Sequence, residues 1–101
     1  MTEDELYRRA NEEMTQCYES GIKCMKNSAD SKRSVRFFRD YTEGEINAIA
    51  YFSQTMYLAI ICNTENDEPE DSESYKNYCN RIHERSKELK NLIIQYAVRF
   101  L

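Results

Sequence analysis

Cations and aromatic rings alternate over one short stretch of the chain, between residues 32 and 41. Lysine and arginine bind phosphate or carboxylate groups, and an aromatic face can stack on a planar ring. We therefore expect this stretch to bind an anionic partner, either an acidic protein surface or a small molecule such as a nucleotide. A solvated helix without a ligand is the alternative interpretation. The candidate binding residues are Lys32, Arg33, Arg36, Phe37, Arg39 and Tyr41.

A second charged stretch is acidic. Residues 42–74 carry eight acidic residues and no basic residue, and most of the acids fall between positions 65 and 71. Acids at a helix start complement the helix dipole, but this number exceeds what one helix start needs. We expect an acidic docking surface that occupies a basic groove on another macromolecule, with a solvated helix start as the alternative. Its candidate residues are Glu65, Asp67, Glu68, Glu70 and Asp71.

Catalytic and metal chemistry have weaker support. Cys79 and His83 are four residues apart and could ligate a metal from one helix face, but the chain has a single histidine and no Cys-x-x-Cys spacing. Glu12 and Glu13 begin the EExxE pattern with which some helical nucleotide hydrolases hold magnesium, but the last acid is missing. We expect a protein that is not an enzyme and has no cofactor or metal. A magnesium-dependent hydrolase is the least favoured alternative.

The composition narrows the class of protein. A net charge of −4 argues against general nucleic-acid binding. Two glycines and one proline in 101 residues leave little material for a turn-rich β fold. The acidic first residues do not form a secretory signal, and the most apolar run is too interrupted to cross a membrane. We therefore expect a cytoplasmic protein with reduced cysteines.

Apolar residues recur at spacings of three and four along the chain, which predicts amphipathic helices. Thr2 and Thr42 each precede a glutamate by three residues, the capping-box pattern of a helix start, and Pro69 suits the first turn of a helix. We expect long helices over about residues 3–28, 43–63 and 70–101, and a short connecting helix over about 31–39.

Three helices with short connections predict an all-α single domain, an antiparallel up-down-up bundle with one basic and one acidic pole. The last turns of the chain are apolar on every side, more than a three-helix bundle of this size can cover. We therefore expect a homo-oligomer, a dimer or higher, that uses these turns as its contact. The alternative is that the last turn folds onto the connection over residues 31–41. The interface candidates are Leu92, Ile94, Ala97, Val98 and Leu101.

Together these features favour a small non-catalytic binding protein. We expect a self-associating regulator or inhibitor that docks on another macromolecule, a protein, through its charged poles. The alternative is an oligomer that sequesters an anionic small molecule at residues 32–41.

Overall fold

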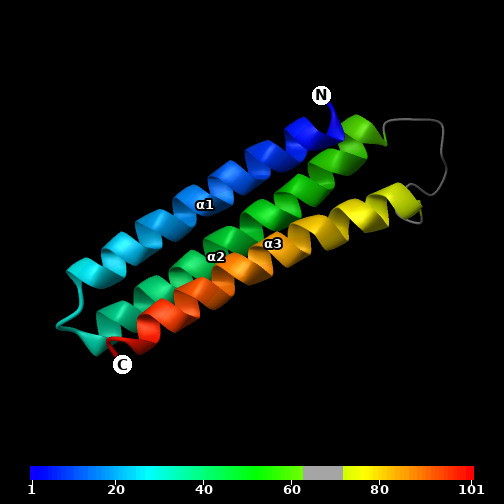
Figure 1. Ribbon diagram of the computed structural model, residues 1–101. Helices are drawn as coiled ribbons and strands as arrows, with labels where there is room; N and C mark the ends of the chain where they lie inside the picture. The colour runs from blue at the N-terminus through cyan, green and yellow to red at the C-terminus, as the bar shows by residue number, and fades with distance from the viewer. Residues whose placement is uncertain (63–71) are drawn as a thin grey trace.

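The structure is a computed structural model that describes residues 1–62 and 72–101, and it is an all-α helical bundle (Figure 1). Helix α1 spans Glu3–Asn27, α2 spans Lys32–Met56 and α3 spans Glu73–Val98. A π-helical turn, η1, continues α2 over Tyr57–Ile61. No strand occurs within the described ranges. The prediction of an all-α fold is confirmed.

Each long helix begins at a hydroxyl side chain. Thr2 Oγ1, Ser31 Oγ and Ser72 Oγ each accept a hydrogen bond from the backbone N–H three residues later, at 3.2 Å. Such caps satisfy a backbone donor that has no partner within the helix. The helix start predicted at Thr2 is therefore confirmed, with Thr2 as the N-cap residue. Helix α3 begins at Glu73 with Ser72 as its N-cap residue, and Pro69 lies outside the described residues.

The predicted division of the second helix is wrong. The sequence pattern places a short helix over 31–39 and a new helix start at Thr42, but α2 is continuous from Lys32 to Met56. Thr42 is buried against Gly21 of α1, so its side chain packs between helices instead of capping one. No residue in this stretch has a positive φ, Gly44 included, so nothing interrupts the helix.

The core runs along the bundle in two clusters of buried side chains. The larger cluster joins all three helices around Met14, Ile46 and Leu89. Within it, the hydroxyls of Ser53 and Tyr78 form a buried hydrogen bond, so neither polar group is left unsatisfied. The smaller cluster comprises Met25, Val35, Ile93 and Ala97.

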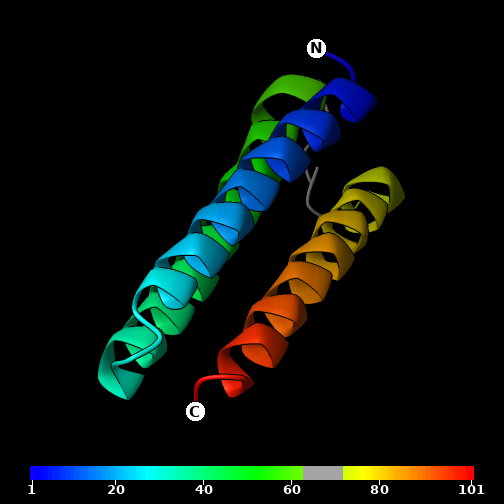
Figure 2. The same cartoon turned by 60° about the vertical axis from the view of Figure 1, so that its left-hand side comes forward.

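Polar contacts fix how α3 lies on α1. Arg81 Nη1 forms an ion pair with Asp4 Oδ1 at 3.1 Å, and its guanidinium lies 3.7 Å from the ring centroid of Tyr7. One turn further on, Arg85 Nε donates to Asn11 Oδ1 at 2.6 Å. Figures 1 and 2 show the helices side by side in a molecule of 55 × 20 × 15 Å, with the C-terminus at the end that holds the α1–α2 connection.

Candidate functional site

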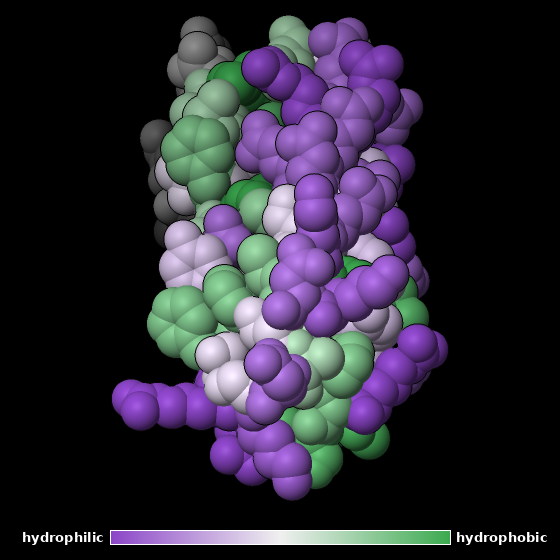
Figure 3. All heavy atoms as spheres, turned by 90° about the vertical axis from the view of Figure 1, so that its left-hand side faces the viewer, coloured by the Kyte–Doolittle hydropathy of each residue, from purple (hydrophilic) through white to green (hydrophobic). Residues whose placement is uncertain are grey.

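The end of the bundle that holds the α1–α2 connection is rich in exposed cations, and we call it the basic end. The residues come from the end of α1, the start of α2 and the end of α3. Figure 3 is viewed from this side and shows hydrophilic side chains projecting around it. The two acids among residues 22–41 are Asp30 and Asp40. The exposed cations are Lys23, Lys26, Lys32, Arg33, Arg36 and Arg99.

Two of these cations lie in the first turn of α2, where the helix dipole is positive. Lys32 and Arg33 occupy that turn, and α2 has no acidic residue there. Helix α1 has the opposite arrangement, with three acids in its first turn. Cations at a helix N-terminus weaken the helix because like charges meet there. Local helix stability therefore does not explain why basic residues occupy positions 32 and 33.

The aromatic candidates Phe37 and Tyr41 are exposed and lie on one face of α2, one turn apart. Their ring centroids are 5.9 Å apart with an interplanar angle of 21°, which is a stacked pair. Arg39 differs from the other candidates because it is half-buried and its Nε donates to Asp40 Oδ1 at 3.0 Å. Its charge is therefore already paired within the chain, while five of the six predicted residues face solvent.

The predicted oligomer contact is exposed except at one position. Leu92, Ile94, Val98 and Leu101 are exposed, and Val98 is the most open of them at 67%. Ala97 is only 1% exposed and packs in the smaller core cluster, because it follows Ile93 by four residues and shares its face. Ala97 therefore belongs to the core. The predicted acidic residues Glu65, Asp67, Glu68, Glu70 and Asp71 lie outside the described residues.

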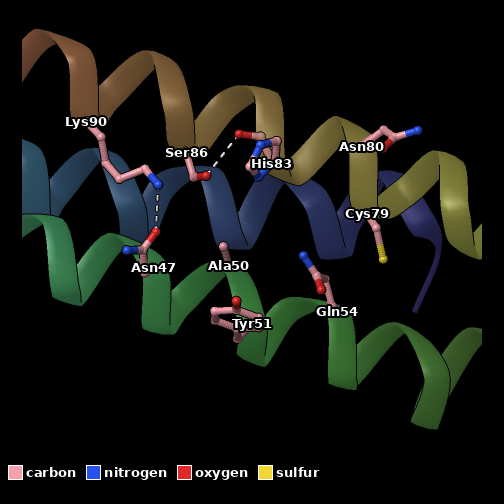
Figure 4. A pocket seen from close by; sticks show the side chains of 9 residues that line it. All are labelled: Asn47, Ala50, Tyr51, Gln54, Cys79, Asn80, His83, Ser86 and Lys90. Carbon is pink, nitrogen blue, oxygen red and sulfur yellow. Dashed lines mark hydrogen bonds between the residues drawn. The ribbon is translucent and has the colours of Figure 1, made fainter.

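A groove of about 590 Å³ lies between α2 and α3 and was not predicted from the sequence (Figure 4). Its floor is formed by two small buried residues that face each other, Ala50 and Ser86, and their size leaves the groove open. The residues around this floor are mostly polar: Asn47, Tyr51 and Gln54 from α2, and Cys79, Asn80, His83 and Lys90 from α3.

Hydrogen bonds within the chain hold part of the groove lining. Lys90 Nζ donates to Asn47 Oδ1 at 2.8 Å, and Ser86 Oγ donates to the carbonyl oxygen of His83 at 2.9 Å. The groove thus offers amides, an imidazole and one ammonium group to a polar ligand. Cys79 and His83 both line it, but the described residues contain no group of three or more metal-ligating side chains. The sequence feature that could have indicated this groove is the recurrence of polar residues at helical spacing on both α2 and α3.

Among residues 1–62 and 72–101, two groups have shifted pKa values, and both lie in structural positions. Burial raises the pKa of the Tyr78 hydroxyl, while its hydrogen bond to Ser53 acts in the opposite direction. Burial, followed by the charges of Glu45 and Glu13, raises the pKa of the Cys17 thiol. A thiol with a raised pKa is a weak nucleophile near neutral pH. Cys17 is therefore not set up for nucleophilic chemistry.

No family model, no curated protein and no solved structure matches this chain. Among the described helices, none is long and apolar enough to cross a bilayer. What the protein does must be argued from its own residues.

Proposed function

We propose that this is a cytoplasmic, non-catalytic binding protein, a regulator or inhibitor whose basic end docks on an acidic surface of a partner protein. Its three helices form an antiparallel up-down-up bundle. Two contacts support this arrangement: Ser53, late in α2, bonds to Tyr78, early in α3, whereas Val35, at the start of α2, packs with Ala97 near the end of α3. The proposal includes self-association.

The observation that carries the proposal is the placement of cations at the positive end of the α2 dipole. Lys32 and Arg33 reduce helix stability where acids would increase it. Residues that oppose local stability mark sites that serve another purpose. An anionic partner would convert this unfavourable arrangement into a favourable one, because helix dipole and side-chain charges would then attract the same group.

A broad acidic surface fits this end better than a single phosphate. The cations come from three helices, including Lys26 of α1, Arg36 of α2 and Arg99 of α3. Charges spread over a surface in this way steer and orient a partner protein. A small anion is bound instead by groups that converge on one point.

The test is the double variant Lys32→Glu/Arg33→Glu, with fluorescent polyglutamate as the acidic probe. We expect the affinity for polyglutamate to fall at least tenfold, while the free energy of unfolding rises by about 0.5–1 kcal/mol because acids suit the first helical turn. If Lys32 and Arg33 form a binding site, the double variant should therefore bind polyglutamate more weakly and be more stable than the wild type.

The matched control is Lys76→Glu/Lys87→Glu, which changes the charge equally at two exposed cations of α3. We expect this control to retain polyglutamate binding within about twofold. Equal binding by both double variants, or no binding by the wild type, would contradict the proposal. Calorimetry with ATP tests the alternative, since heat that depends on Lys32 and Arg33 without polyglutamate binding would favour nucleotide sequestration.

A further inference from the structure

The outward face of α2 carries a stripe with the spacing of a coiled-coil seam, which we call the outer seam. Its residues follow one another at alternating intervals of four and three, the repeat that packs one helix against another. The inner face of α2 already packs with α1 and α3 through Ile46 and Ala50. The six residues of the outer seam are all exposed: Phe37, Tyr41, Gly44, Ala48, Tyr51 and Thr55.

Gly44, at the centre of the outer seam, has no packing contact with any other helix that the structure describes. A Cβ atom added to Gly44 would meet nothing within 4 Å. The contrast is Gly21 of α1, where an added Cβ would lie 2.9 Å from Thr42 Cβ. This chain therefore uses one glycine to bring two helices into close approach. Gly44 offers the same close approach to a further helix, and none of the described helices occupies that space.

The outer seam is complementary to itself when two copies run antiparallel. Its residues are arranged symmetrically about Ile46, so Gly44 meets Ala48 of the partner subunit and Tyr41 meets the partner's Tyr51. Small residues then face small residues at the two-fold axis, and rings face rings on either side. Such self-complementarity is what a two-fold symmetric interface requires.

The charges of α2 favour the same antiparallel pairing. All of its charged residues lie in the first half, and residues 46–62 carry none. A parallel pair would bring Arg33 and Arg36 against their own copies. In the antiparallel pair, Arg36 lies opposite Met56 of the partner subunit and Arg33 lies opposite the partner's Ala59, both in the uncharged half.

The exposed rings supply a large part of the area that a dimer needs. Phe37, Tyr41, Tyr51 and the flanking Phe52 are 60, 57, 71 and 64% exposed. At roughly 200 Å² for each aromatic side chain, these four rings offer about 500 Å² on one partner. A stable interface buries about 800 Å² on each side, and the rest of the outer seam with its flanking residues can supply the difference.

We propose that the outer seam of α2 binds the outer seam of a second copy of this chain, antiparallel and centred on Gly44 and Ala48. This assigns the self-association to α2 instead of the C-terminal turns of α3. It leaves the exposed apolar residues near Val98 outside the contact. The pairing also places the basic ends of the two copies at opposite ends of the dimer.

Sedimentation velocity over a range of protein concentrations tests the contact. We expect the wild type to form a dimer and Ala48→Glu, which places a carboxylate at the two-fold axis, to raise the dimer dissociation constant at least a hundredfold. Ala48 is exposed, so its substitution leaves the core intact. Asn77→Glu, on the exposed surface of α3, is the matched control and is expected to change the constant less than twofold.

A third variant, Val98→Glu, separates the two candidate surfaces. We expect it to dimerise like the wild type. Dissociation by Val98→Glu but not by Ala48→Glu would overturn the proposal in favour of the C-terminal turns. A wild type that remains monomeric at every concentration would also overturn it, and the outer seam would then be open to a helix of another protein.

A photoreactive phenylalanine at position 41 tests the orientation without weakening the contact. In the antiparallel pair, we expect it to cross-link to the partner subunit near residue 51, identified by mass spectrometry of the linked peptides. Cross-links to the partner near residue 41 would indicate parallel helices and overturn the proposed geometry.

Discussion

The contact between α1 and α2 at Gly21 and the outward face of α2 at Gly44 use the same residue in opposite surroundings. Both glycines lie inside helices of 25 residues, where glycine reduces helix stability by about 1 kcal/mol relative to alanine. At Gly21 this loss is offset by the close packing of Thr42, whereas no contact within residues 1–62 and 72–101 offsets it at Gly44. The comparison supports the proposal that α2 has one face for its own bundle and one face for a partner.

The starts of α1 and α2 differ in the same way. The first turn of α1 carries three acids that suit the helix dipole, and the first turn of α2 carries Lys32 and Arg33, which oppose it. In both comparisons, exposed residues of α2 reduce local helix stability and no packing contact among the described residues offsets this loss. Substitutions at packed positions and at exposed positions of the outer seam should therefore change the free energy of unfolding by clearly different amounts.

The largest difference is expected between valine substitutions at the two glycines. Gly21→Val should lower the free energy of unfolding by about 2–3 kcal/mol, because the new side chain would overlap the buried Thr42. Gly44→Val should raise it by a few tenths of a kcal/mol at low protein concentration, since valine forms helix better than glycine. Urea unfolding followed by circular dichroism measures both, and equal effects would refute the contrast.

A smaller difference is expected between two tyrosines. Tyr78→Phe should lower the free energy of unfolding by about 1–2 kcal/mol, because the buried hydroxyl of Ser53 loses its partner. Tyr51→Phe should change it by less than about 0.5 kcal/mol, since the Tyr51 side chain is 71% exposed. If the two variants unfold at the same urea concentration, the hydrogen bond between Ser53 and Tyr78 does not contribute to the free energy of unfolding.

The buried hydroxyl of Tyr78 also predicts a dependence on pH. Burial raises the pKa of Tyr78 above its ordinary value of 10.0, so the unfolded chain loses this proton before the folded one does. The contribution of Tyr78 to stability is therefore constant below about pH 10 and decreases as the pH rises further. Urea midpoints measured against pH should fall less steeply above this value for Tyr78→Phe than for the wild type. Identical slopes would contradict this assignment.

The smallest effect concerns Cys17, on the α1–α2 side of the bundle. Its raised pKa follows from burial first and from the charges of Glu45 and Glu13 second. Glu45→Gln should therefore increase the rate of alkylation of Cys17 by iodoacetamide about two- to threefold, because more thiolate is present. Mass spectrometry of the Cys17 peptide measures the rate. Glu12→Gln is the control and should leave it unchanged; an equal increase in both variants would exclude Glu45 as a cause.

The sequence predicted the helices whose apolar periodicity is uninterrupted. The limits of α1 follow from Thr2 and from the stripe that buries Met14 and Met25. The pattern failed at Thr42, because a threonine three residues before a glutamate describes a helix start equally well when the threonine instead packs against a glycine of another helix. That distinction depends on a tertiary contact, which periodicity along one segment does not contain.

The site residues were predicted less completely. Exposed cations and rings between residues 32 and 41 were found, because charge and aromatic content can be read directly from the sequence. The pairing of Arg39 with Asp40 and the burial of Ala97 depend on side-chain orientation. The groove floored by Ala50 and Ser86 depends on how α2 and α3 pack together, so neither helix alone indicates it.

The central claim, that α2 has a face for a second copy, is tested most directly by urea unfolding at increasing protein concentration. The wild type and Gly44→Gln are compared, since glutamine favours helix by about 0.5 kcal/mol over glycine but places a long polar side chain in the outer seam. Gly44→Gln should be the more stable protein at low concentration. The wild-type midpoint should then rise with concentration and overtake it, while that of Gly44→Gln stays constant. A wild-type midpoint that does not depend on concentration, or an equal rise in both proteins, would contradict the claim.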